Sequence, residues 1–168
     1  MTIKTDCTVE KFSIGFVIFR IMLMLTVFGF GTYILFSIGK WFIVPFGILG
    51  IVLFLYILHT TCRHCYYYCR RCDLGLGKLA SLICKSGGLN KDLYVANAKK
   101  SIPWLSALLL SPAIAGIIVL MFNYTVIMLF KVIGYIFLIC LFLLTGFLLA
   151  CPRCKMNKIC PASIYKDD

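Results

Sequence analysis

The chain has 168 residues and a formal net charge of +11; 62% of its residues are hydrophobic, 14% are charged, and the mean hydropathy is +1.00. A water-soluble domain needs polar side chains over its surface, so this composition excludes a soluble globular fold and predicts an integral membrane protein. The predicted class is all-α, because an open sheet or irregular backbone facing lipid would leave peptide groups without hydrogen-bond partners.

Four apolar segments are long enough to cross a bilayer. A helix of about 20 apolar residues spans a hydrocarbon layer of about 30 Å. The predicted spans are residues 12–38, 41–58, 104–122 and 126–150. Short connections at residues 39–40 and 123–125 join these spans in pairs, so we predict four transmembrane helices arranged as two helical hairpins.

The hairpins divide the chain into four parts. These are the first hairpin with a short N-terminus (1–59), a basic cysteine-rich loop (60–102), the second hairpin (103–150) and a cysteine-containing tail (151–168). The N-terminus, loop and tail lie on one side of the membrane in this arrangement, and they carry 14 of the 17 Lys and Arg residues. By the positive-inside rule that side is the cytoplasm, so we predict a multi-pass protein of the cell membrane with both termini cytoplasmic.

The positive charge also bears on binding partners. Membrane topology and anionic headgroups account for Lys and Arg at the membrane ends, so we expect the lipid bilayer, and not nucleic acid, as their partner. Two cations fall inside spans, and we predict that Arg20 and Lys131 extend their side chains to the nearest interface. The predicted spans contain no Asp, Glu or His, which argues against a transporter.

The loop is expected to hold a short amphipathic helix. Leucine and isoleucine residues between positions 74 and 83 follow helical spacing, so we predict a helix that lies on the cytoplasmic face of the membrane. Another short helix is predicted over residues 91–99, ending before Pro103 opens the third span. The three tyrosines at 66–68 fit the aromatic belt of the membrane interface.

Clustered cysteines are the main chemical signal in the sequence. Eight of the ten cysteines lie in the loop and the tail, where a reducing cytoplasm argues against structural disulfides. Thiols clustered in this way bind metal ions or perform redox exchange. Cys140 lies within the fourth span instead, where we predict a small packing residue.

Two C-x2-C pairs occupy equivalent positions after the second and fourth spans. Cys62 and Cys65 are separated from Cys151 and Cys154 by the same 89 residues (62 to 151 and 65 to 154). This spacing predicts a weak internal duplication, with the hairpins as parallel repeats about an axis near the membrane normal. Such an axis brings the pairs together, and two C-x2-C pairs are typical ligands of one tetrahedral zinc ion. We therefore predict a shared site that ties one hairpin to the other.

A second group of candidate ligands remains. Its members are Cys69, Cys72 and Cys160, with Cys84, His59 and His64 as candidates for a fourth ligand. Such a group suits either a second zinc ion or an iron–sulfur cluster, which also takes four thiolates. Cys160-Pro161 matches one element of cluster motifs, but the compact C-x2-C-x2-C-x3-C-P run is absent. His59 also suits a purely interfacial position at the end of a helix.

The expected function is that of a multi-pass membrane protein with a cytoplasmic cysteine-rich metal-binding module. Structural zinc would link the hairpins, and the module would offer a docking surface. The alternative is an iron–sulfur protein that transfers electrons near the membrane, followed by soft-metal handling, thiol–disulfide exchange and palmitoylation of the thiols. We identify no catalytic constellation in the sequence. Small residues predict helix contacts within the chain, with a protein partner or with a second copy: Gly29, Gly31, Gly47, Gly50, Ala113, Ala115, Gly116 and Gly134.

Overall fold

The computed structural model describes residues 11–84, 90–122, 124–156 and 159–161. Over these ranges the chain is helical and has no β-strand. The α-helices are α1 (Ile14–Ile38), α2 (Ile43–Thr60), α3 (Leu76–Ile83), α4 (Lys91–Phe122) and α5 (Val126–Thr145). Four helical segments, which contain α1, α2, α4 and α5, are long and apolar enough to cross a membrane. The all-α class and four helices of spanning length and composition are confirmed.

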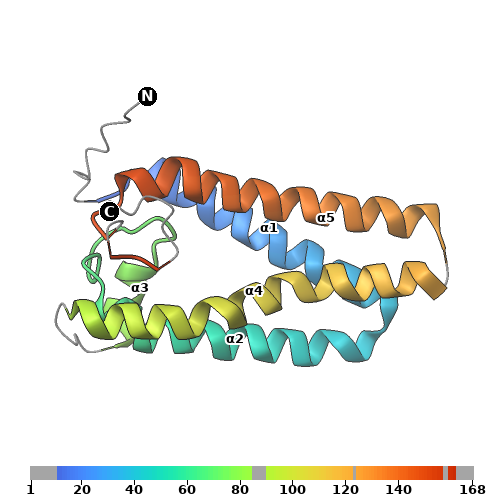
Figure 1. Ribbon diagram of the computed structural model, residues 1–168, viewed down its shortest axis with the longest axis horizontal. Helices are drawn as coiled ribbons and strands as arrows, with labels where there is room; N and C mark the ends of the chain where they lie inside the picture. Colours follow the sequence, from blue (N-terminus) through green and yellow to red (C-terminus); the bar gives the residue numbers. More distant parts are fainter. Residues whose placement is uncertain (1–10, 85–89, 123, 157–158, 162–168) are drawn as a thin grey trace.

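The four long helices lie side by side in a bundle (Figure 1). Helix α1 packs against both α4 and α5, whereas α2 packs mainly against α4. The buried core between α1, α4 and α5 consists of Val27, Ile34, Ala113, Met128, Tyr135 and Ile139. Helices α1 and α2, which follow each other in sequence, contact each other less than α1 contacts α4 or α5. The two-hairpin arrangement and the repeat stay predictions.

Small residues permit close helix contacts at two points of this core. A Cβ atom added to Gly31 would lie 3.0 Å from the Tyr135 hydroxyl, and one added to Gly116 would lie 2.5 Å from Val132 Cγ2. A Cβ on Gly116 would therefore collide with Val132, whereas a Cβ on Gly31 would require Tyr135 and Pro112 to shift slightly. A Cβ on Gly47, by contrast, would meet no heavy atom within 4 Å among the described residues. Some of the predicted small-residue contacts thus lie within the chain, whereas Gly47 makes no such close contact with the described residues.

Helix α4 is continuous from Lys91 to Phe122, so the predicted end of a separate helix before Pro103 is wrong. Asn97 Nδ2 donates a hydrogen bond to the carbonyl oxygen of Thr60 at 3.0 Å, and Ala98 and Ser101 are buried. These contacts pack the first part of α4 against the end of α2. They stabilise the helix on the N-terminal side of Pro103, where the proline removes one backbone donor.

Two short turns follow the long helices at one end of the bundle. A 3-10 turn, Cys62–His64, comes after α2. A second 3-10 turn, Cys151–Arg153, follows α5 through the π-helical segment Gly146–Ala150. Helix α3 lies at the same end, at the left of Figure 1, whereas the α1–α2 and α4–α5 connections lie at the opposite end. The cysteine-rich end comprises residues 59–84, 150–156 and 159–161.

The predicted amphipathic helix is present as α3, although it begins two residues later than the apolar pattern. Gly77 and Ala80 are buried, whereas Leu82 and Ile83 are 78% and 56% exposed. One face of α3 therefore packs against the protein, and its last turn presents apolar side chains outward. That outward face suits the predicted position at a membrane surface.

Candidate functional site

The two C-x2-C turns share one backbone conformation. Cys65 N–H donates to the carbonyl of Cys62, and Cys154 N–H donates to the carbonyl of Cys151, both at 3.2 Å. The residue before each turn is helical, and the last cysteine of each is extended, with φ/ψ of −82°/150° for Cys65 and −79°/128° for Cys154. The sequence similarity of the two pairs is thus accompanied by the same local structure at the end of a long helix.

All four of these cysteines line one cavity of about 330 Å³. Cys72 lines it as well, together with side chains from α1, α4 and the C-terminal part of the α5 span. Within the described ranges, however, no group of three or more His, Cys, Asp or Glu side chains is close enough to hold a metal ion. The thiols therefore face a common space without forming a closed coordination sphere.

The other predicted ligands are distributed around this cavity. Cys160 lies outside its lining, and its sulfur is 3.7 Å from the Tyr94 hydroxyl oxygen. Cys69 is exposed. Cys84 Sγ lies 3.8 Å from His59 Nδ1. Cys72 thus lies with the first C-x2-C pair, and the structure does not bring Cys69, Cys72 and Cys160 together as a second group.

His64 and Cys140 occupy different environments. His64 is buried at the first turn and does not line the cavity. Cys140 is exposed on α5, so the prediction of a packed residue is wrong. Its side chain lies on the outer face of α5, whereas the neighbouring Ile139 packs in the core.

The start of α3 holds Cys72 in place. Gly75 adopts φ 69°, a left-handed conformation that favours glycine, and it precedes the first residue of α3. Gly77 N–H then donates to Cys72 Sγ at 3.3 Å. A Cβ on Gly77 would lie 2.0 Å from the carbonyl oxygen of Tyr67, so no larger residue fits there. The sequence DLGLGK therefore forms a tight helix start against the cysteine loop.

Burial keeps the thiols of Cys65, Cys72 and Cys154 protonated at neutral pH. It raises the pKa of Cys65 to about 11 and the pKa of Cys154 to about 12. Backbone hydrogen bonds from Tyr67 and Met156 oppose these shifts without cancelling them. Burial likewise raises the pKa of Cys72. A metal ion that binds here must therefore displace protons, so its affinity should increase with pH.

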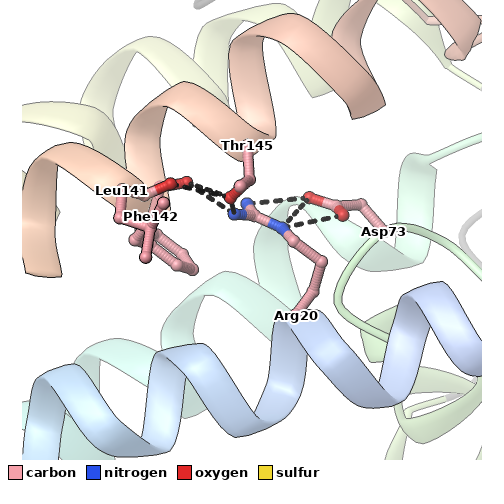
Figure 2. Close-up of polar contacts among 5 residues, drawn as sticks. All are labelled: Arg20, Asp73, Leu141, Phe142 and Thr145. Atoms are coloured by element: carbon pink, nitrogen blue, oxygen red, sulfur yellow. Dashed lines mark hydrogen bonds and ion pairs between the residues drawn. The ribbon is translucent and has the colours of Figure 1, made fainter.

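Arg20 forms an ion pair with Asp73 (Figure 2). Both residues line the cavity. Arg20 Nε lies 3.0 Å from Asp73 Oδ1, and the two side chains are 4% and 25% exposed. Its Nη1 donates to Thr145 Oγ1 at 2.6 Å and to the carbonyl oxygen of Phe142, whose ring centroid is 4.2 Å from the guanidinium carbon. Arg20 therefore extends to Asp73 of the loop, where its guanidinium is buried and not exposed to solvent. An internal carboxylate and α5 acceptors satisfy the charge instead.

The π-helical segment after α5 makes room for this arginine. A Cβ on Gly146 would lie 2.9 Å from Arg20 Nη2. The segment begins at Gly146, about one turn after Phe142, whose carbonyl accepts a hydrogen bond from Arg20. Such π-bulges are frequent at functional sites. Burial raises the pKa of Asp73, while the neighbouring guanidinium opposes that shift. Helices α1 and α5 and the loop are thus joined at one point next to the thiols.

Tyrosines connect the loop to the tail. Tyr67 is 2% exposed, and its hydroxyl oxygen accepts a hydrogen bond from the backbone N–H of Lys155 at 3.1 Å. Lys155 Nζ also donates to the hydroxyl oxygen of Tyr66 at 3.0 Å. Tyr67 is therefore a core residue, and its assignment to an aromatic belt is wrong. Its ring packs against Phe12, two residues before α1, with 5.7 Å between ring centroids.

Several residues of this site were not identified from the sequence. They include Asp73, Tyr94 and Thr61. The buried hydroxyl oxygen of Thr61 has no hydrogen-bond partner in the described part of the chain. A signal for the ion pair was present, since Arg20 is isolated in an apolar span and Asp73 directly follows a cysteine. Comparison with protein-family models, curated proteins and solved structures found no match to this chain.

Proposed function

We propose that this chain is a multi-pass protein of the cell membrane whose cysteine-rich end lies in the cytoplasm and binds a metal ion through thiolates. Zinc is the first candidate, with a structural role. The observation that carries this proposal is the pair of C-x2-C turns, which share one backbone conformation and face one cavity. Two such turns are the usual donors of a tetrahedral zinc site.

In this proposal the ligands are Cys62, Cys65, Cys151 and Cys154. Zinc–sulfur bonds of about 2.3 Å require the thiols to move inward from the cavity wall. The ion would then link the loop to the tail, and so the first predicted hairpin to the second. A metal bond of this kind contributes directly to folding free energy, because the site does not exist in the unfolded chain. The exposed face of the loop is left as a docking surface.

The charges around the cavity support an anionic metal centre. Four thiolates and one zinc ion carry a net charge of about −2. The Arg20 guanidinium lines the same cavity, and Lys155 and Arg70 lie close to the loop tyrosines. Because Asp73 offsets the charge of Arg20, the additional positive charge near the loop comes from Lys155 and Arg70, and positive groups favour thiolates over thiols.

An iron–sulfur cluster is the second candidate, and the size of the cavity favours it. A volume of about 330 Å³ exceeds the space that one ion needs. The buried Thr61 hydroxyl lines this cavity and could donate to a cluster sulfide, an interaction that tunes reduction potential. In that case the protein would transfer electrons at the membrane surface.

Elemental analysis and an ultraviolet–visible spectrum of anaerobically purified protein test these proposals. About one zinc per chain without visible absorption supports the structural site. Iron with acid-labile sulfide and a broad band near about 400 nm supports the cluster. Copper or mercury that binds and exchanges rapidly supports soft-metal handling. Protein without bound metal, whose thiols exchange with a disulfide reagent, contradicts the metal proposal and supports thiol chemistry.

Single substitutions test the shared site. We expect Cys62→Ser and Cys151→Ser each to lower metal content and thermal stability, because each removes one ligand. Cys140→Ser is the matched control, since this exposed cysteine on α5 does not line the cavity. Equal metal content in all three variants would show that the two turns do not share an ion.

A further inference from the structure

A second cavity lies between α2 and α4, separate from the cysteines. Its volume is about 460 Å³, and its lining consists of Leu49, Val52, Leu53, Tyr56, Lys100 and Trp104. The four α2 residues follow the helical spacing i, i+3, i+4 and i+7, so they form one stripe along α2. Lys100 and Trp104 are one turn apart on α4. Leu53 is 8% exposed and forms the floor, whereas Val52 and Trp104 on the sides are 57% and 64% exposed.

The groove changes from polar to apolar along its length. Tyr56 and Lys100 lie near the Asn97–Thr60 hydrogen bond, which marks the cysteine-rich end of α2. Leu49 lies about 10 Å further into the predicted span at the helical rise per residue. Lys100 is exposed and has no ion-pair partner among the described residues. The groove thus has a free cation at the membrane interface and an apolar floor below it.

We propose that this groove binds an anionic phospholipid from the leaflet on the cysteine-rich side. The lipid phosphate pairs with the Lys100 ammonium group and accepts a hydrogen bond from the Tyr56 hydroxyl. Trp104 lies at the boundary between headgroup and acyl chain, where indole rings are enriched. One acyl chain packs along Leu49 and Val52. This site shares with the proposed function only the insertion of the chain into a membrane, and it does not depend on metal binding.

Charge complementarity favours a lipid over a second copy of the chain. Two copies related by a two-fold axis along the membrane normal place equal depths of the groove opposite each other. Lys100 of one copy then faces Lys100 of the other at a low-dielectric interface, and like charges in contact are unfavourable. A single anionic headgroup neutralises this lysine instead.

Native mass spectrometry of the full chain, released from mild detergent, tests the proposal. Dioleoyl phosphatidylglycerol is titrated in parallel with dioleoyl phosphatidylcholine, which has the same acyl chains and no net charge. We expect the first bound lipid to show about fivefold tighter binding for phosphatidylglycerol, the usual contribution of one lysine near anionic lipid. Lys100→Ala should remove this preference. Lys99→Ala, which removes the same charge from an exposed neighbour outside the groove, should retain it.

The apolar part of the groove is tested separately. Val52→Trp fills the groove and should lower the affinity for both lipids. Ile51→Trp is the matched control, because Ile51 is 63% exposed and does not line the groove. Thermal unfolding of each variant shows whether the fold is retained. Equal affinity for the two lipids, equal effects of Lys99→Ala and Lys100→Ala, or a dimer that Val52→Trp dissociates would overturn the proposal.

Discussion

The two C-x2-C turns have the same backbone conformation but differ in what supports them. The first turn is followed by a loop that folds back on itself. In this loop Gly77 packs against Tyr67, and its N–H donates a hydrogen bond to Cys72 Sγ. Asp73 then fixes this loop to Arg20 on α1. The second turn is followed by a short tail, whose Lys155 rests on tyrosines of that loop.

The tail therefore relies on contacts with the loop more than the loop relies on contacts with the tail. The loop makes its own internal contacts and binds the helices through the Arg20–Asp73 ion pair. The tail is attached through the hydroxyl groups of Tyr66 and Tyr67, which the loop provides, and through the contact of Cys160 with Tyr94 on α4. Damage to the loop should therefore disturb both turns, whereas damage to the tail contacts should disturb the second turn alone. The following variants test this order.

The largest effect is expected for Gly77→Ala. Its Cβ would lie 2.0 Å from the Tyr67 carbonyl oxygen and 2.7 Å from that of Arg70, so the backbone must move. We expect a loss of more than about 3 kcal/mol in the free energy of unfolding, together with undocking of the tail. Thermal unfolding in detergent measures the loss. Gly47→Ala is the control and should change stability by less than about 1 kcal/mol, because its Cβ meets nothing within 4 Å.

The next effect is expected for Asp73→Asn. This change leaves the Arg20 charge buried without its carboxylate, which costs about 3 kcal/mol. Combining it with Arg20→Met should recover at least half of that loss, because the unpaired charge is removed as well. Denaturation of the single and double variants measures the coupling. If the losses of the two single variants simply add in the double variant, the ion pair does not join α1 to the loop. Asp92→Asn is the control, because Asp92 is exposed.

Thiol reactivity distinguishes the partly buried Cys65 from the exposed Cys69. Burial raises the pKa of Cys65 to about 11, about two units above an ordinary thiol. In metal-free protein at pH 8, Cys65 should therefore react with iodoacetamide about 100-fold more slowly than an unperturbed thiol, because only the thiolate attacks. Its rate should rise about tenfold per pH unit up to pH 10. The exposed Cys69 is the internal reference, and equal rates at the two sites would contradict the burial of Cys65.

The smallest effect is expected for Tyr67→Phe. Loss of the hydrogen bond from Lys155 N–H should cost about 1 kcal/mol and loosen the tail. Hydrogen exchange should become faster at the Lys155 amide, and Cys154 should become easier to alkylate, while Cys65 stays protected. Tyr124→Phe is the control, since Tyr124 is 69% exposed at the other end of α5. Faster exchange throughout the first turn would show instead that the two turns depend on each other equally.

The helical class and the four long helices could be predicted because they depend on local composition. Apolar runs of spanning length need no knowledge of the partner helix, since backbone hydrogen bonding within each helix already excludes other structures in lipid. The continuous course of α4 through Pro103 was missed, because the contacts that stabilise it come from Thr60, 37 residues away along the chain.

The part of the candidate site that local sequence motifs encode could be predicted. The C-x2-C pairs are local motifs, so Cys62, Cys65, Cys151 and Cys154 could be recognised from spacing alone. The position of Cys72 beside the first pair, and of Cys160 beside Tyr94, depends on how the loop and tail pack. Spacing along the chain contains no information about that packing.

The sequence by itself determined that this chain is a helical protein with four apolar helices and that its thiols cluster after the second and fourth of them. Only the tertiary structure decided that Arg20 pairs with Asp73, that Tyr67 is buried under the tail, and which thiols face one cavity. The physical reason is the range of the interactions. Helix formation in lipid is settled by neighbouring residues, whereas a buried charge or hydroxyl group is satisfied by whichever distant segment the fold brings to it.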